Sequence, residues 1–130
     1  MRTHPAAAIL LSAFFAAGTA RADAMAELLA AYGGGPFDSA AGAAFWQQRH
    51  KGADAGGRSC TTCHTADTRQ PGRHAATGKA IDPLAPSVSP RRLTDRPEIE
   101  KWLMRNCKWT LGRECTAQEK GDILTFLRAQ

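Results

Sequence analysis

The sequence predicts an all-α single domain. Two segments in its second half combine a helix-start signal with apolar residues at helical spacing, and no segment shows the alternating pattern of a strand. No internal repeat or second domain is visible. A chain of 130 residues buries only a modest core, so we expect a disulfide or a covalently held cofactor to support it.

Residues 1–22 have the composition of an export signal. A short basic start precedes an apolar run over residues 6–17, which is too short to span a membrane. Small residues then allow signal peptidase to cut after Ala22, with cleavage after Ala24 as the competing choice. We therefore expect residues 23–130 to form the mature domain in a bacterial periplasm, where disulfides persist.

Two helices and a long loop are expected in the first part of the mature chain. Residues 23–32 are rich in alanine and leucine, and three glycines and a proline at residues 33–36 end that helix. Asp38, or the serine after it, can cap a second helix that runs to about His50. From residue 65 to 97 the chain has five prolines and little periodicity, so we expect an ordered loop that wraps a functional group.

Two further helices are expected near the C-terminus. Asp95, with Glu98 three residues later, makes a capping-box-like start. The apolar face of that helix is formed by Ile99, Trp102 and Leu103. Thr116 and Glu119 form a second capping box ahead of the last apolar segment.

The segment Cys60-Thr61-Thr62-Cys63-His64 is the C-x-x-C-H attachment signature of a c-type haem. The two thiols add to the haem vinyl groups, and His64 supplies an imidazole to the iron from the same turn. A redox dithiol would belong beside a βαβ pattern, and none is visible. A four-cysteine zinc site would need Cys107 and Cys115, whose spacing is unlike that of a structural zinc pair, and would leave His64 without a role.

The residues alone offer both a methionine and an asparagine as the ligand on the other side of the iron. Electron-carrying cytochromes c use a methionine, and Met104 is the candidate because Met25 belongs to a helix expected to pack at the rear. Helical geometry puts Met104 about 140° from Ile99, away from the apolar face. Asn106 lies about 20° from Ile99 on that face, where an amide needs a partner. That partner is either the iron or, equally, backbone groups at the helix end or water.

Other residues are candidates for contact with the haem. Both His50 and His74 are flanked by cations, so we expect them to be solvated or near propionates, with bis-histidine ligation as an alternative. Arg73, His74 and Lys79 are candidate propionate partners by charge, and solvation is the competing outcome. We expect Trp102, one turn before the asparagine, to line the distal pocket, with a core role as the alternative.

Cys107 and Cys115 are expected to form a disulfide in an oxidising compartment. The bond closes a short loop and pins the turn just after Asn106. A plain structural staple is a sufficient role for it, and holding the end of a ligand-bearing helix would follow from the same bond.

A set of motifs beyond C-x-x-C-H carries a family resemblance. They are Pro71-Gly72-Arg73-His74, Thr77-Gly78-Lys79, Pro83-Leu84-Ala85-Pro86, Lys101-Trp102, Arg105-Asn106-Cys107, Cys115-Thr116 and Glu119-Lys120-Gly121-Asp122. Together they resemble the SHP cytochromes, of the "sphaeroides haem protein" type, over roughly residues 46–127.

The resemblance implies a variant class I cytochrome c fold with one covalently attached haem. It implies His64 as the proximal ligand, Asn106 as the axial ligand opposite it, and a Cys107–Cys115 disulfide beside the site. In that family the asparagine leaves the reduced iron, and O2 or NO can then bind. A neutral amide oxygen is a hard donor that prefers ferric iron, which explains the switch. Family members are linked to a dihaem cytochrome c and a membrane cytochrome b as electron donors.

The leading hypothesis is therefore a periplasmic monohaem c-type cytochrome that binds O2 or NO and acts in electron transfer or as a haem oxidoreductase. A plain electron carrier with Met104 as sixth ligand is the alternative, and a non-haem zinc or redox module is the third reading. Loss of Arg2 and Arg21 with the signal, together with two haem propionates, brings the mature protein near neutrality. We therefore expect no nucleic-acid partner despite the formal net charge of +5, and we expect a monomer.

Overall fold

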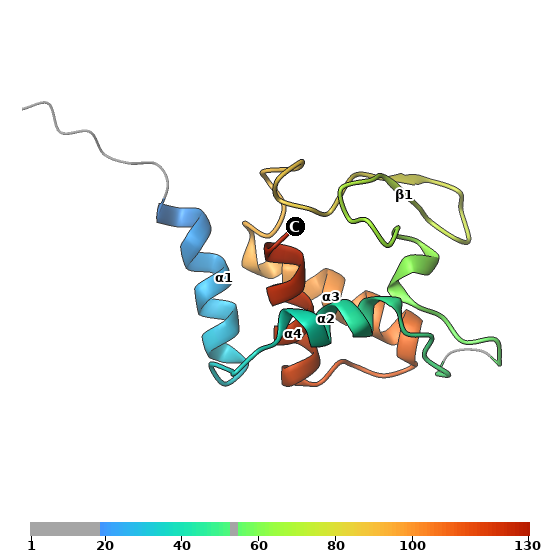
Figure 1. The fold of residues 1–130 in the computed structure, drawn as a ribbon, viewed down its shortest axis with the longest axis horizontal. Coiled ribbons are helices and arrows are strands. Elements are labelled where there is room, and N and C mark those ends of the chain that lie inside the picture. The colour runs from blue at the N-terminus through green and yellow to red at the C-terminus, as the bar shows by residue number, and fades with distance from the viewer. Residues whose placement is uncertain (1–18, 53–54) are drawn as a thin grey trace, which may run out of the picture.

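The described part of the chain, residues 19–52 and 55–130 of a computed structural model, is mainly helical (Figure 1). Its elements are α1 (Thr19–Ala31), α2 (Ser39–Gln47), the one-turn 3-10 helix η1 (Cys60–Thr62), β1 (Gly72–Arg73), β2 (Ala80–Ile81), α3 (Arg96–Leu111) and α4 (Ala117–Arg128). The predicted all-α class is confirmed. None of the helices among these residues is long and apolar enough to cross a bilayer.

The first two helices differ from the expected bounds at their ends. Helix α1 begins four residues before the expected start at Asp23, and α2 ends at Gln47 rather than near His50. Helix α2 ends early because the chain after it pairs with a later segment. The His50 amide donates to the Arg58 carbonyl at 2.7 Å, and the Arg58 amide donates to the His50 carbonyl at 3.0 Å. Residues 1–18, most of the expected export signal, lie outside the described residues, and the signal stays a prediction.

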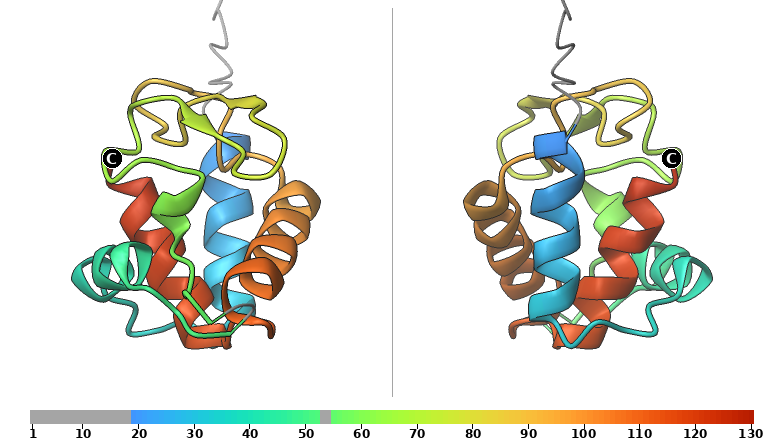
Figure 2. Two further views of the ribbon diagram at one scale, coloured as in Figure 1. Left: turned by 90° about the vertical axis from the view of Figure 1, so that its right-hand side faces the viewer. Right: turned by 90° about the vertical axis from the view of Figure 1, so that its left-hand side faces the viewer.

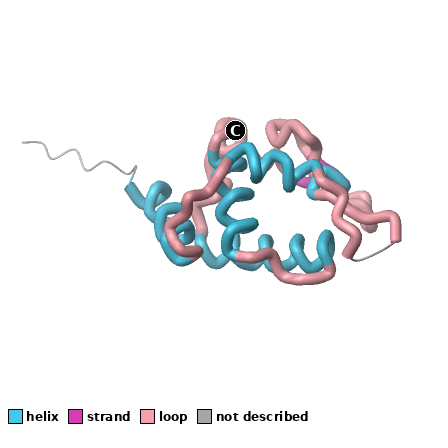
Figure 3. Tube along the Cα trace, turned by 60° about the horizontal axis from the view of Figure 1, so that its bottom comes forward, coloured by secondary structure: helices cyan, strands magenta, loops and turns pink. Residues whose placement is uncertain are grey.

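The expected long loop contains a small hairpin that the sequence did not predict. β1 and β2 pair antiparallel, with Gly72 opposite Ile81 and Arg73 opposite Ala80. Each strand has only two residues, so the alternating pattern that reveals longer strands is absent. The hairpin is small beside the helices and loops (Figure 3), and it lies at the opposite end of the long axis from α1 (Figure 1).

The caps of the last two helices are those that the sequence predicts. The Asp95 carboxylate accepts the Glu98 amide at 2.8 Å at the start of α3. At the start of α4 the Thr116 hydroxyl accepts the Glu119 amide, and the Glu119 carboxylate accepts the Thr116 amide. Satisfied first-turn amides fix where each helix begins, and the position of α3 decides where Asn106 lies.

Glu119 also makes a two-pronged ion pair with Arg113, at 2.8 Å for each nitrogen–oxygen contact. The Arg113 hydrogen bond, aided by the Thr116 amide, lowers the pKa of Glu119 from 4.5 to about 2. A carboxyl whose pKa is lower in the folded state stabilises the fold above pH 4.5, and loses that effect as pH falls toward 2.

We therefore expect Glu119→Gln to reduce the free energy of unfolding at pH 7 and to flatten its decline between pH 4.5 and 2. Urea unfolding of the holoprotein at several pH values measures this. Arg113→Gln removes the ion-pair partner of Glu119 instead, and it should likewise flatten the decline of the free energy of unfolding over this pH range. A decline as steep as that of the parent protein in both variants would contradict the assignment.

The core consists of two clusters of buried side chains. The first joins α2, the disulfide region and α4; its members are Trp46, Cys107, Cys115, Ile123, Phe126 and Leu127. The second joins α1 to α3 and α4, and its members are Met25, Leu28, Ile99 and Leu124. Figure 2 shows α1 between α3 and α4 on that side of the molecule. Together these clusters leave η1 and the hairpin at the end away from α1.

Helices α2 and α4 approach closely because α2 carries Gly42. A Cβ at this position would collide with the Asp122 carbonyl and lie 2.8 Å from the Phe126 Cβ. The Asp122 carboxylate is buried and accepts hydrogen bonds from the backbone amide of Asp38 at 2.7 Å and from the side-chain Nε2 of Gln118 at 2.9 Å. The start of α2 is thereby fixed to α4.

Candidate haem site

The C-x-x-C-H motif folds into a single tight turn. Ser59 caps η1, and its amide donates to the Thr62 hydroxyl at 3.1 Å. The amides of Cys63 and His64 both donate to the Cys60 carbonyl, at 3.4 and 3.0 Å. The two thiols and the imidazole therefore come from one short turn, as the sequence predicts for a haem attachment motif.

Trp46 of α2 anchors this turn to the core. Its indole nitrogen donates to the Thr65 carbonyl at 3.1 Å, and its ring centroid lies 5.4 Å from that of His64. Trp46 is buried and also packs against Phe126 of α4. The sequence did not predict this role, although a buried tryptophan needs a partner for its N–H.

Burial sets the protonation of the motif: it keeps the Cys60 thiol protonated and the His64 imidazole neutral. Cys60 and Cys63 are free thiols and half-buried, and burial raises the pKa of the Cys60 thiol to about 12. Burial, with the charge of Arg92 as a second cause, lowers the pKa of His64 to about 4. A neutral imidazole offers a lone pair to a metal. These residues fit a c-type haem, with Cys60 and Cys63 as attachment points and His64 as iron ligand.

The hairpin loop folds over the motif. The Arg73 amide donates to the Cys63 carbonyl at 2.7 Å, and the Ala75 amide contacts the Cys63 sulfur at 3.3 Å. Gly72 lies so close to the Cys63 carbonyl that a Cβ would collide with it. An open cavity of about 400 Å³ lies here, lined by residues from Thr61 to Thr65, by Pro71 to Arg73 and by Ala80.

Of the predicted propionate partners, the structure brings only Arg73 to this cavity. Its guanidinium donates to the Gly78 carbonyl at 2.7 Å. His74 and Lys79 are exposed and do not line the cavity, and the His74 Nδ1 accepts the Thr77 amide at 3.2 Å.

Arg92 is a cation near the motif that sequence reasoning missed. It is half-buried, and it donates to the carbonyls of Pro83 and Asp82 at 3.0 Å each. Its charge acts on His64, far from it in the sequence. No local pattern could have identified it, because the loop fold alone brings the two residues together.

His50 is half-buried, so it is only partly solvated, and its place near a propionate stays a prediction. Its Nε2 lies 3.2 Å from the Phe45 carbonyl, and its ring centroid lies 4.4 Å from that of Phe45. The ring is therefore packed against the end of α2.

Helix α3 shows a departure from expectation. Its buried side is formed by Ile99, Cys107 and Thr110, with half-buried Leu103 between them. Trp102 and Asn106, four residues apart, lie on the neighbouring exposed stripe, and Trp102 is 45% exposed. Asn106 joins neither core cluster, because both clusters pack against the adjacent side of the helix, and its role as an iron ligand stays a prediction. The core role for Trp102 is wrong for the same reason, and its place in a distal pocket stays a prediction.

The two methionines left in the expected mature chain lie in different surroundings. Met25 is buried in the rear cluster with Leu28 and Ile99, so it is unavailable as an iron ligand. Met104 is 39% exposed on α3. Met104 and Asn106 are two residues apart, so they point to opposite sides of the helix, about 160° apart.

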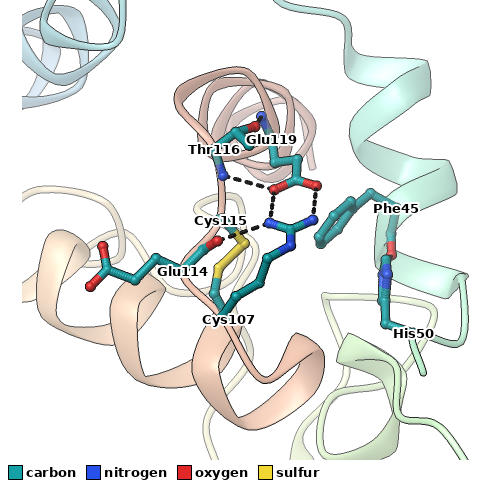
Figure 4. Close-up of a disulfide and its surroundings, with 8 residues drawn as sticks. Phe45, His50, Cys107, Glu114, Cys115, Thr116 and Glu119 are labelled. Atoms are coloured by element: carbon teal, nitrogen blue, oxygen red, sulfur yellow. Dashed lines mark hydrogen bonds and ion pairs between the residues drawn. A yellow bond between two sulfur atoms is a disulfide. The ribbon is translucent and has the colours of Figure 1, made fainter. Parts of the chain in front are cut away.

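The disulfide joins Cys107 near the end of α3 to Cys115 before α4 (Figure 4). Their Cα atoms are 5.5 Å apart. The short connection between them is held further by Arg113, which donates to the Glu114 carbonyl at 2.8 Å and pairs with Glu119. A four-cysteine zinc site is excluded, because two of the four thiols are joined to each other. No three potential metal-ligating side chains gather elsewhere in the described residues.

Comparisons with known proteins agree with this geometry. Residues 33–127 match a family described as a domain of unknown function (DUF1924). The cytochrome c-type protein SHP of Cereibacter sphaeroides is 44% identical over 126 residues, which cover 94% of this chain and 97% of that protein. Cytochrome c'' of Methylophilus methylotrophus is 33% identical over 86 residues, 66% of this chain and 60% of that protein.

Solved structures of c-type cytochromes have the same fold. Oxidized SHP, described as an oxygen-binding cytochrome c, superimposes with a TM-score of 0.75 at 44% identity, over 85% of this chain and 96% of that one. Oxidized cytochrome c'' superimposes with a TM-score of 0.70 at 27% identity, over 86% and 95%. The fold is thus that of a variant c-type cytochrome, and its cofactor is haem c. The chain belongs to the domain family matched over residues 33–127 and, among the c-type cytochromes, to the SHP family.

Proposed function

We propose that this chain is a monohaem cytochrome c in which Asn106 binds the ferric iron opposite His64 and leaves it on reduction, so that O2 or NO can bind. Cys60 and Cys63 would hold the haem covalently. A haem iron supplies one-electron chemistry and an axial position for a diatomic ligand. The surrounding residues decide whether a protein side chain occupies that axial position.

The observation that carries this proposal is the orientation of α3. The Arg58 guanidinium lies 4.1 Å from the centroid of the Trp109 ring, and Arg58 is two residues before Cys60. This contact marks the side of α3 that faces the segment leading into the haem motif. Asn106 is about 60° from Trp109 around the helix, whereas Met104 is about 140° away. Asn106 is therefore better placed than Met104 to reach a haem held by that motif.

The surroundings of Asn106 also suit a weak, reversible ligand. Its side-chain amide makes no hydrogen bond to another described residue, and Trp102 precedes it by one turn on the same stripe. Lys101 and Arg105 lie over the Trp102 ring, at 5.3 and 5.6 Å from its centroid. A neutral amide oxygen prefers ferric to ferrous iron, so one-electron reduction favours its release.

The proposal extends to the setting of the protein. The signal-like residues 1–22 support export to the periplasm as a monomer. The SHP resemblance supports a dihaem cytochrome c and a membrane cytochrome b as electron donors.

Absorption spectra of the periplasmically matured protein test the ligand switch. We expect a six-coordinate ferric spectrum, a high-spin spectrum after dithionite reduction, and a complete shift on addition of CO, because the reduced iron lacks a strong sixth ligand. Met104→Leu is the matched control and should leave all three spectra unchanged. A low-spin reduced spectrum that ignores CO, lost in Met104→Leu, would identify a methionine-ligated electron carrier instead.

A further inference from the structure

Arg58 joins the two segments that carry the proposed iron ligands. Besides stacking on the Trp109 ring, its guanidinium donates to the Trp109 carbonyl at 3.0 Å. The two residues are 51 positions apart in the sequence. One belongs to the strand-like segment that enters the haem motif, and the other lies in the last turn of α3.

This contact acts on a helix end. The Trp109 carbonyl is among the last four of α3, which have no amide partner inside the helix. A guanidinium at this place satisfies the carbonyl and interacts favourably with the negative end of the helix dipole. The planar side chain can stack and donate at once, which an ammonium cannot do.

A second contact brings the backbone before the haem motif against the end of α3. Gly52 lies against the end of α3, where a Cβ would collide with the Leu111 carbonyl. A Cβ on Gly112 would in turn lie 2.8 Å from the Gly52 carbonyl. The backbone of the entering segment thus touches the helix end directly, and Arg58 adds the side-chain link to it.

We propose that Arg58 is a positioning residue for Asn106: it fixes the last turn of α3 relative to the haem-attachment turn, and so strengthens ligation of the ferric iron by the amide. This inference rests on the proposed function. Asn106 is three residues before Trp109, and His64 is six residues after Arg58, so each ligand is close in sequence to one side of the same contact. A loosened junction would leave the amide out of reach for more of the time.

The test is Arg58→Met in the haem-loaded protein, with imidazole as an added ligand that competes with Asn106 for ferric iron. We expect imidazole to bind about tenfold more tightly, because apparent affinity rises with the fraction of molecules whose position is open. The same tenfold loss of ferric stabilisation raises the midpoint potential by about 59 mV. Titration of the ferric spectrum and a spectroelectrochemical potential measure the two effects.

Arg49→Met is the matched control. Arg49 donates to the carbonyls of Gly56 and Gly57 in the same entering segment, and no described contact joins its side chain to α3. It should leave imidazole affinity and potential near those of the parent protein. Arg58→Lys serves if the methionine variant fails to load haem, and it should give a smaller shift in the same direction.

A double variant separates this inference from the proposed function. If Arg58 acts through Asn106, Arg58→Met should change imidazole affinity less than about twofold in an Asn106→Ala background. A full effect in that background, or a folded Arg58→Met protein with unchanged affinity and potential, would overturn the inference. An Asn106→Ala protein with an unaltered ferric spectrum would instead overturn the ligand assignment itself.

Discussion

Replacement of Asn106 by alanine is expected to abolish the six-coordinate ferric spectrum while leaving CO binding by the reduced protein intact. Alanine supplies no oxygen to the iron, so the ferric state loses a stabilising ligand that the ferrous state does not use. A loss of at least tenfold in that stabilisation raises the midpoint potential by about 59 mV or more. Ferric absorption spectra and a potentiometric titration provide the measurements.

Asn106→Asp is the matched companion variant. The carboxylate has the shape of the amide but is a harder, anionic donor, so it should keep six-coordination and lower the midpoint potential. Opposite shifts in the two variants would identify the side chain as a ligand. Equal spectra in the parent and alanine proteins would mean that another residue closes the iron.

Gly42→Ala is expected to destabilise the holoprotein by about 3 kcal/mol, which lowers the melting temperature by roughly 10–20 °C. The new methyl group would collide with the Asp122 carbonyl and press on Phe126, so α2 must move away from α4. Helix propensity alone predicts the opposite sign, since alanine is favoured over glycine by about 1 kcal/mol within a helix. Thermal and urea unfolding measure whether the free energy of unfolding falls or rises.

The control for this variant is Ala41→Leu, one residue earlier on the exposed side of α2. It adds more volume but meets solvent, so the free energy of unfolding should change by less than about 0.5 kcal/mol. A stabilised Gly42→Ala protein would mean that α2 and α4 do not approach as closely as the structure places them.

The elements that the sequence predicted well are those defined by neighbouring residues. The starts of α3 and α4 follow from side chains that bond amides three residues away, at Asp95 and Thr116. The C-x-x-C-H turn is likewise complete within five residues. The end of α2 was missed because the pairing of His50 with Arg58 competes with another helical turn.

The face of α3 shows the limit of periodicity. Helical spacing correctly grouped Ile99 with Leu103 as inward-facing, but it also assigned Trp102 and Asn106 to the same side. An apolar stripe read from the sequence has a width of about 100°, so residues at its edge can face either the core or the outside. Contacts with α1, α2 and α4 decide where that edge lies.

By itself, therefore, the sequence determined the haem-attachment turn, the helix caps and the pair of cysteines able to form a disulfide, because each depends on chemistry within a few residues. Only the tertiary structure decided that Trp46 packs on His64, that Arg92 acts on the same imidazole, and which side of α3 faces the haem motif. These relations join residues far apart in the chain. Their proximity follows from how the helices pack around Gly42 and the two core clusters, and no local pattern encodes that packing.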